Sequence, residues 1–215
     1  MKIKSACFDM DGTLIRNTDS VRYLCMLNNN LHKFEETERL ENNKNISWIE
    51  TDHLKAELIK GLDLKEVEDR FDDNIELIQN IEEVLAYLRE KEIKSILITA
   101  GPIQVADIVG KKSGFDVVYG SRYEIDDQKF TGEITTHLGN YGKLDCLKEY
   151  CRENGVNPEH CVAIGDSESD IAIFEECGRS IAINYSDVME GTASEYIITD
   201  DLFDIIAVLE SWLAE

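Results

Sequence analysis

The sequence has few prolines, few basic residues and no long apolar run. Only 2 of its 215 residues are proline, and no low-complexity tract interrupts it, which argues against long disordered stretches. No segment approaches the roughly 20 apolar residues that a membrane span needs, and no long apolar stretch follows the basic residues Lys2 and Lys4. We therefore expect a fully folded cytoplasmic protein that is neither exported nor inserted into a membrane.

The shortage of basic residues limits the possible partners. The chain has 22 basic and 44 acidic residues and a formal net charge of −22. Such a surface repels nucleic acid and anionic lipid unless a local basic patch compensates, and no such patch occurs in the sequence. A small anionic substrate stays possible where the binding site carries a cation of its own, and we expect a metal ion to supply it.

The cysteines and histidines lack the spacing of disulfide frameworks or of metal sites. The six cysteines contain no C-x-x-C pair, so we expect reduced thiols, and the four histidines show no ligand spacing. These residues are Cys7, Cys25, Cys146, Cys151, Cys161 and Cys177, with His32, His53, His137 and His160. We expect all ten to be structural or to lie at the surface.

Short apolar runs recur along the chain, with helical patterns between most of them. The predicted strands are Ile3–Phe8, Ser95–Thr99, Val117–Tyr119, Cys161–Ile164, Ser180–Ile183 and Tyr196–Thr199. Alternating strands and helices predict an α/β fold, a doubly wound and mostly parallel sheet covered by helices on both faces.

Capping residues mark the helices of this fold. Asn80 precedes a helix that has acidic residues in its first turn, and Pro102 opens a helix that ends at Gly114. Further helices are predicted over Tyr141–Glu153, Ser169–Cys177 and Asp200–Leu213, and a hairpin with a polar turn is predicted over residues 123–134.

Residues 16–79 break the alternation, because this segment has helical periodicity without any convincing strand. It is too long for a simple crossover, and we expect a small helical cap inserted after the first strand, with Trp48 packed inside it. The predicted domains are a core of residues 1–15 and 80–215 and a cap of residues 16–79. The polar stretch at residues 28–45 is expected to form a solvated helix and loop.

Polar residues follow the predicted strands where each strand ends. Because ligands of open parallel sheets bind beyond the carboxyl ends of the strands, we expect these side chains to gather at one site. The candidates are Asp9 and Asp11 after the first strand, Thr99, Ala100 and Gly101 at the second, Asp166 and Asp170 after the Cys161–Ile164 strand, and Lys143 on the helix before it.

Four carboxylates in one site would repel each other, and a divalent cation resolves the conflict. Mg²⁺ prefers hard oxygen ligands and often binds one or two carboxylates together with phosphate oxygens. Thr99 and the backbone amides that follow it can donate hydrogen bonds to a phosphate, and Lys143 can add a positive charge. No serine, cysteine or histidine is better placed than the aspartates for nucleophilic attack. Asp9 is therefore the predicted nucleophile, and Asp11 the predicted general acid and base.

These residues resemble the four ordered motifs of the haloacid dehalogenase superfamily of phosphohydrolases. The resemblance rests on FDMDGTLI at 8–15, ILITAG ending the second strand, Lys143, and GDSESD at 165–170, and it covers nearly the whole chain. The cap after the first motif is similar to that of the phosphoserine phosphatase branch. The resemblance implies a Rossmann-like core, a Mg²⁺ cofactor, and the residue roles given next.

By this resemblance, Asp9 is nucleophile and metal ligand, and Asp11 is acid/base and gives the metal its backbone carbonyl. Asp166 completes the protein's metal ligands, Thr99 and Lys143 bind phosphate, and Asp170 orients Lys143 or a metal-bound water.

The chain departs from the phosphoserine phosphatase pattern at three positions. Those enzymes are similar in having a glutamate nine residues after the nucleophile, where this chain has Thr18 beside Asp19. Their cap arginine corresponds approximately to Lys55, and their asparagine before the last aspartate of the fourth motif corresponds to Ser169. We expect Lys55 to meet a substrate carboxylate, Asp19 an ammonium, and Ser169 to lie near the substrate.

Three functions are compatible with these residues. The first is a Mg²⁺-dependent phosphomonoesterase that acts on a small phosphorylated metabolite through an aspartyl phosphate. The second is a phosphotransferase that passes the same phosphoryl group to an acceptor alcohol. The third is a non-catalytic phosphate-binding regulatory protein, which we would expect to lack Asp9 or Asp11, although both are present. The sequence specifies neither the substrate nor the oligomeric state.

Overall fold

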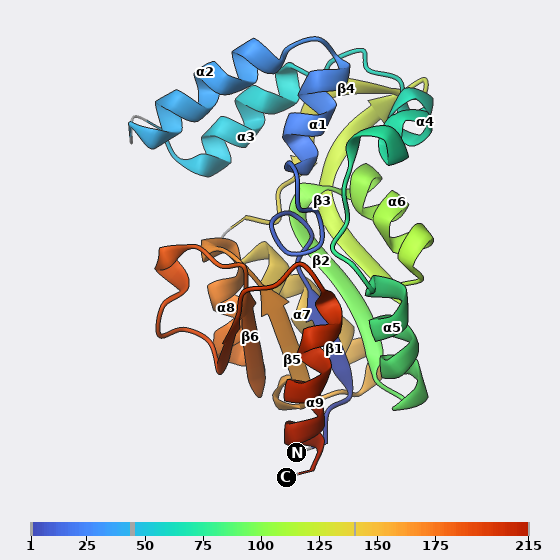
Figure 1. The fold of residues 1–215 in the computed structure, drawn as a ribbon. Coiled ribbons are helices and arrows are strands. Elements are labelled where there is room, and N and C mark those ends of the chain that lie inside the picture. The colour runs from blue at the N-terminus through green and yellow to red at the C-terminus, as the bar shows by residue number, and fades with distance from the viewer. Residues whose placement is uncertain (1, 44–45, 140, 215) are drawn as a thin grey trace.

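A seven-stranded sheet forms the centre of the protein, as the computed structural model shows for residues 2–43, 46–139 and 141–214 (Figure 1). The strand order is β4-β3-β2-β1-β5-β6-β7, and all neighbouring strands are parallel except β3 and β4. The strands are β1 Ser5–Phe8, β2 Lys94–Pro102, β3 Val117–Asp126, β4 Lys129–Thr136, β5 Cys161–Gly165, β6 Arg179–Ile183 and β7 Glu195–Ile197.

Helices cover both faces of this sheet. They are α1 Ser20–Leu27, α2 Leu31–Asn42, α3 Trp48–Glu57, α4 Leu64–Asn74, α5 Ile81–Glu90, α6 Ile103–Ser113, α7 Gly142–Asn154, α8 Ile171–Glu176 and α9 Ile205–Leu213. Short 3₁₀ turns lie at Pro158–His160, Glu168–Asp170, Asp187–Met189 and Leu202–Asp204. Among the described residues, none of the helices is long and apolar enough to span a membrane.

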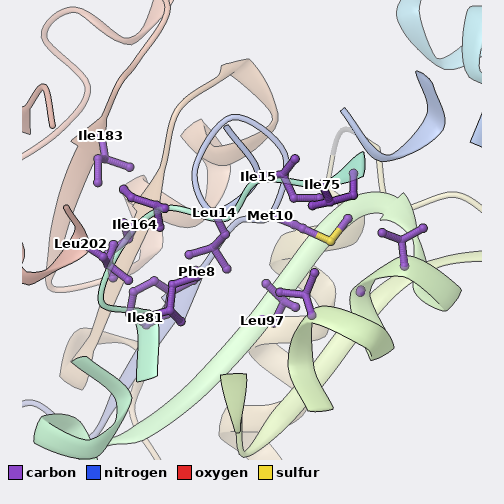
Figure 2. Packing of buried hydrophobic residues seen from close by; sticks show 14 of the residues in the cluster. Phe8, Met10, Leu14, Ile15, Ile75, Ile81, Leu97, Ile164, Ile183 and Leu202 are labelled. Atoms are coloured by element: carbon purple, nitrogen blue, oxygen red, sulfur yellow. The ribbon is translucent and has the colours of Figure 1, made fainter. Parts of the chain in front are cut away.

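Alternating side chains of the buried strands feed two apolar clusters. Phe8 of β1 packs in a cluster with side chains of α5, α6 and α9, and Figure 2 shows Phe8 beside Ile81 and Leu97. Its neighbour Cys7 belongs to a second cluster, with side chains of α7 and α8 such as Leu147. This two-residue period on a strand buried on both faces fixes the register of β1 at the centre of the sheet.

Helices α1, α2 and α3 lie beyond the carboxyl end of β1, and the β3–β4 hairpin extends toward them (Figure 1). The hairpin is joined to the chain between α3 and α4 by backbone hydrogen bonds: Gly61 N donates to Phe130 O (2.8 Å), and Phe130 N donates to Leu62 O (3.0 Å). Buried apolar residues of these helices, Phe34 among them, belong to the same cluster as Phe8. The helical insertion therefore packs on the hairpin, while its description as a separate domain of residues 16–79 stays a prediction.

The predicted α/β class is confirmed, but several element limits were wrong. Strand β2 continues through Ala100 and Gly101 to Pro102, because Pro102 pairs with Ser121 of β3. Strand β3 runs without a break into the hairpin. The helix predicted to start at Ser169 is a 3₁₀ turn followed by α8.

Asn80 directly precedes α5, as the sequence predicts, but its side chain does not cap the helix. This residue has a left-handed backbone (φ 60°) and makes no capping hydrogen bond to α5. Its amide nitrogen instead donates to both carboxylate oxygens of Asp201, each at 2.8 Å, and so links the start of α5 to the turn before α9.

Candidate active site

The loop after β1 turns tightly and places two aspartates at the end of the strand. Asp9 N donates to Ile164 O of β5 (2.9 Å), and the amides of Leu14 and Ile15 both donate to Met10 O (2.8 and 2.9 Å). The side chains of Leu14 and Ile15 are buried and anchor the loop in the apolar cluster (Figure 2). Asp9 is itself buried, with 5% of its surface exposed.

Gly12 allows this loop to approach the end of β5. Its φ is +78°, a left-handed conformation that favours glycine, and an added Cβ would lie 2.2 Å from Asp166 Oδ2. The loop that carries Asp9 and Asp11 therefore packs directly against the Asp166 carboxylate.

Lys143 brings a positive charge to the buried end of β1. Its ammonium on α7 lies 2.8 Å from Asp170 Oδ1 and 2.8 Å from Asp9 Oδ1, and the residue is 1% exposed. It donates a hydrogen bond to Asp170, whereas Asp9 Oδ1 is close but receives no well-aligned hydrogen bond among the described residues. Burial lowers the pKa of Lys143, but the charges of Asp170 and Asp9 outweigh this effect and keep the pKa above its ordinary value. The lysine therefore stays charged.

Asp170 organises the loop after β5. Its Oδ2 accepts hydrogen bonds from the backbone amides of Asp166 (3.1 Å) and Ser167 (3.2 Å), while its Oδ1 accepts from Lys143. Thr13 Oγ1 donates to Asp166 Oδ1 at 3.3 Å. Because both oxygens of Asp170 already have donors, this residue is suited to hold Lys143 and the loop in position.

The carboxylates of Asp9, Asp166 and Asp170 have the arrangement of a cation site. One oxygen from each lies within 4.8 Å of the other two. The pKa of Asp166 is raised to about 9, mainly by burial and secondly by the charge of Asp9. The pKa of Asp9 is raised to about 6, mainly by burial and secondly by the charge of Asp170. The unsatisfied Asp9 Oδ1 and this mutual repulsion fit a hard divalent cation such as Mg²⁺, which binds carboxylate oxygens.

Asp11 has surroundings that favour a proton carrier. Its two oxygens accept hydrogen bonds from Ser20 N (2.7 Å) and Ser20 Oγ (2.5 Å). Burial, and next the charge of Asp19, raises the pKa of Asp11 to about 8, so the protonated form is well populated near neutral pH. Sequence reasoning missed Ser20, because its role depends on how the start of α1 meets the loop.

The second predicted motif lies inside β2. Thr99 is 1% exposed, and its Oγ1 accepts a hydrogen bond from Gly101 N at 2.9 Å. Ala100 O accepts from Ser121 Oγ of β3 at 2.6 Å. A Cβ at Gly101 would lie 2.8 Å from Asp11 Oδ2, so this position is adjacent to the predicted acid. The strand was predicted to end at Thr99, but it continues through Ala100 and Gly101 to Pro102.

Lys55 lies in an acidic group within the cap. It is 7% exposed, forms an ion pair with Glu38, and lies 3.8 Å from both Glu41 Oε2 and Asp52 Oδ1. Its ammonium is also 4.8 Å from the centre of the Phe34 ring. This lysine therefore already faces three carboxylates of the protein.

Asp19 and Ser169 lie on different elements, at the start of α1 and on the 3₁₀ turn after β5. Asp19 caps α1, with its Oδ1 accepting from Arg22 N at 2.7 Å. Ser169, on the 3₁₀ turn after β5, lines a cavity of about 300 Å³ together with Trp48 of the cap. Trp48, which was predicted to pack in the cap, forms part of this cavity wall.

Comparisons with known proteins agree with this geometry. The family model described as haloacid dehalogenase-like hydrolase matches residues 6–175. The phosphoserine phosphatase of Archaeoglobus fulgidus is 28% identical over 206 residues, which are 94% of this chain and 59% of that protein. That of Methanocaldococcus jannaschii is 24% identical over 212 residues, 97% of this chain and 99% of the relative.

Solved structures show the same fold. A substrate-bound phosphoserine phosphatase superposes with a TM-score of 0.84 at 21% identity, covering 97% of this chain and 99% of that one. The matched residues span 59% of the length of the Archaeoglobus protein, which is less than two thirds. Because the family model covers well over half of the chain, the protein belongs to the haloacid dehalogenase-like hydrolases, with its sequence relatives among the phosphoserine phosphatases.

Proposed function

We propose that the protein is a Mg²⁺-dependent phosphomonoesterase that hydrolyses a small phosphorylated metabolite through an aspartyl phosphate on Asp9. The observation that carries this proposal is the buried Lys143 ammonium, 2.8 Å from both Asp9 and Asp170. The Asp166 carboxylate completes the group. Such a site combines a nucleophilic carboxylate with positive charge for a phosphoryl group, and a phosphoryl transfer needs little more than positioning and electrostatic stabilisation.

In the first half of the reaction, a carboxylate oxygen of Asp9 attacks phosphorus and the bond from phosphorus to the alcohol oxygen breaks. Asp11 gives its proton to that oxygen, and the alcohol leaves. In the second half, water attacks phosphorus, Asp11 takes a proton from it, and Asp9 is released with inorganic phosphate. Lys143 stays charged throughout and stabilises the phosphoryl oxygens.

Asp9 and Asp166, with the backbone carbonyl of Asp11, would hold the cation. Mg²⁺ bound there would supply positive charge to the phosphoryl group and to the attacking carboxylate. In this proposal Asp170 positions Lys143, and Thr99 donates a hydrogen bond to the phosphate.

The remaining predicted contacts to the substrate, from Ala100, Gly101, Ser169 and Asp19, are part of the same proposal. Lys55 would contact the substrate only if the substrate carries a carboxylate. The relatives are named phosphoserine phosphatases, which makes phosphoserine a candidate substrate. A cap of residues 16–79 that covers the bound substrate, and a cytoplasmic location, are also proposed.

A direct test is the Mg²⁺-dependent release of inorganic phosphate from p-nitrophenyl phosphate. We expect activity that EDTA abolishes and that Asp9→Asn removes, because an amide cannot form the acyl phosphate. Full activity of Asp9→Asn would overturn the assignment of the nucleophile. Asp126→Asn, on the exposed end of β3, serves as the control and should keep full activity.

The same assay separates the two other functions. A phosphotransferase would convert an added alcohol into a new phosphate ester, which product analysis detects beside inorganic phosphate. A regulatory protein would bind phosphate without hydrolysing any ester in a broad panel. The presence of both Asp9 and Asp11 favours hydrolysis over this last function.

A further inference from the structure

Tyr123 places a buried polar group beside the active site that the proposed reaction does not use. The residue lies on β3, is 3% exposed, and its hydroxyl has no hydrogen-bond partner among the described residues. Burial, and next the nearby charges of Asp52 and Asp11, holds the pKa of Tyr123 well above its ordinary value. The hydroxyl therefore stays protonated.

An unpaired buried hydroxyl is costly, and such groups are rare without a functional reason. The ring of Tyr123 makes an edge contact with Phe130, with the ring centroids 6.4 Å apart, and its backbone carbonyl accepts a hydrogen bond from Gln104 Nε2 at 2.8 Å. The ring is therefore fixed, while the hydroxyl has no hydrogen-bond partner among the described residues.

The charged groups around this hydroxyl are mainly acidic. Asp11, Asp19 and Asp52 all act on Tyr123 electrostatically. Two cations lie over the Phe34 ring, and both already have acidic partners: Arg22 pairs with Glu35, and Lys55 faces Glu38, Glu41 and Asp52. A substrate carboxylate would have to compete with these three for one ammonium, and it would face the repulsion of the remaining acids.

The cavity beside Ser169 has the same character. Its described lining includes the aromatic rings of Trp48 and Tyr141 and the carboxylates of Glu168 and Glu175, and it includes no lysine, arginine or histidine. Aromatic faces and carboxylates together bind organic cations. His137 links the cavity wall to the acidic group by direct contacts, because its ring contacts Trp48 and its Nε2 lies 2.9 Å from Asp52 Oδ2.

From these observations we propose that the alcohol portion of the substrate carries an amine or quaternary ammonium and no carboxylate. Tyr123, Asp19 and Asp52 would recognise the cation. This inference rests on the proposed phosphomonoesterase function, and it differs from the amino acid phosphate named for the relatives.

The test compares phosphate esters of similar length that differ in charge. Phosphoethanolamine and phosphocholine carry a cation, ethyl phosphate is neutral beyond its phosphate, phosphoglycolate carries a carboxylate, and phosphoserine carries both charges. We expect kcat/KM for the better cationic ester to exceed that for ethyl phosphate and for phosphoserine by about tenfold or more, the value of one charge-assisted hydrogen bond.

Two conservative variants test the assigned residues. Tyr123→Phe removes only the hydroxyl, and Asp19→Asn removes a charge while keeping an N-cap side chain. Tyr123→Phe should raise KM for the cationic ester about tenfold and leave kcat/KM for ethyl phosphate within about twofold. Asp19→Asn should lower the ratio of kcat/KM for the cationic ester to kcat/KM for ethyl phosphate about tenfold, with both values taken at the pH optimum of the variant because the Asp19 charge also acts on Asp11. Asp63→Asn is the matched control, because Asp63 caps α4 in the same manner, with Oδ1 accepting from Lys65 N at 2.9 Å.

The outcomes separate this inference from the proposed function. Hydrolysis of p-nitrophenyl phosphate with equal or better use of phosphoserine or phosphoglycolate would overturn the inference and leave the phosphatase intact. An equal loss on ethyl phosphate in Tyr123→Phe and Asp19→Asn would overturn the residue assignment. Absence of all Mg²⁺-dependent hydrolysis would overturn both.

Discussion

At the scale of single residues, the site depends on charges that the fold holds close together. Lys143 compensates Asp9 and Asp170, but a third carboxylate, Asp166, lies in the same group. Breaking a buried ion pair by removing one partner is strongly destabilising, whereas removing a surplus like charge relieves repulsion. Residues of this group should therefore respond to mutation in opposite directions.

Asp166→Asn should make the metal-free protein more stable than the metal-free wild type. It should also remove the additional stability that Mg²⁺ gives the wild type. Burial and like charges raise the pKa of Asp166 to about 9 in the metal-free fold, above its unfolded value of about 3.9, so folding near neutral pH must protonate this carboxyl at a cost in stability. The neutral amide of asparagine removes that cost. We expect Tm in EDTA to rise by about 2–4 °C, and the further rise that Mg²⁺ gives the wild type to disappear.

Thermal unfolding with EDTA and with Mg²⁺ measures both effects. Asp126→Asn, far from the carboxylate group, should keep the wild-type response to Mg²⁺. A metal-free Asp166→Asn protein that is less stable than the wild type would contradict the account of repulsion.

Gly12→Ala should disturb the metal group through a steric effect. The new Cβ would be in a left-handed conformation and 2.2 Å from Asp166 Oδ2, so we expect a loss of about 1–3 kcal/mol in the free energy of unfolding together with weaker Mg²⁺ binding.

Gly61→Ala provides the matched control, because Gly61 also has a positive φ (+84°) but no atom within 4 Å of its added Cβ. Urea unfolding and Mg²⁺ titration calorimetry of the two variants separate backbone strain from the contact with Asp166. Equal Mg²⁺ affinity in both variants would refute the contact.

At the scale of elements, a polar link joins the start of β2 to the start of β3. Asp116 accepts hydrogen bonds from Lys94 Nζ (2.7 Å), Ser95 N (2.9 Å) and Ser95 Oγ (3.0 Å). Burial favours the protonated form, yet these donors outweigh it and hold the pKa of Asp116 below its usual value. The link thus stabilises the fold when Asp116 is ionised.

Asp116→Asn should reduce the free energy of unfolding at pH 7 by about 0.5–1 kcal/mol after solvent screening. Since the folded pKa is lowered, this contribution is present above the unfolded pKa of about 3.9 and is lost as pH falls through the folded value. The deficit relative to the wild type should therefore shrink at pH 3.

Urea unfolding at both pH values measures this difference. Asp69→Asn breaks the exposed Lys65–Asp69 pair on α4 and should change stability little at either pH. A deficit for Asp116→Asn that grows toward pH 3 would contradict the sign of the pKa shift.

The elements that sequence could predict are those whose signal is local. Apolar runs located β1, β5 and β6, and Gly114 marked the end of α6 in its left-handed conformation. The extension of β2 through Ala100–Pro102 could not be read from the sequence, because Ala-Gly-Pro is typical of a loop and becomes strand only through pairing with Ser121. Long-range pairing decides such limits.

The same distinction applies to the site. Asp9, Asp166 and Asp170 could be predicted to meet because parallel strands bring their carboxyl ends to one edge, and the structure brings them together. Tyr123 and Ser20 could not, because their positions depend on how the hairpin and α1 pack beside that edge. Their residue types carry no signal of their own.

At the scale of the whole molecule, the strong negative charge and the buried lysine act on the substrate together. A chain of net charge −22 repels phosphate esters at its surface, so favourable charge for them must be concentrated at Lys143 and the cation site. The same acidic surface attracts a cationic leaving group, in agreement with the composition of the cavity beside Ser169.

The hairpin connects the two parts of the molecule that make the site. Strand β3 carries Tyr123 toward the cap, while β4 hydrogen-bonds to the chain between α3 and α4 (Figure 1). The cap and the sheet edge are thereby held in contact by one element.

The central claim is that Asp9 carries the phosphoryl group. Borohydride added during turnover of p-nitrophenyl phosphate with Mg²⁺ reduces an aspartyl phosphate to homoserine, which peptide mass spectrometry can locate. The account predicts homoserine at position 9 of the wild type and none in Asp9→Asn. Rapid turnover of the wild type without any homoserine at position 9 would contradict it.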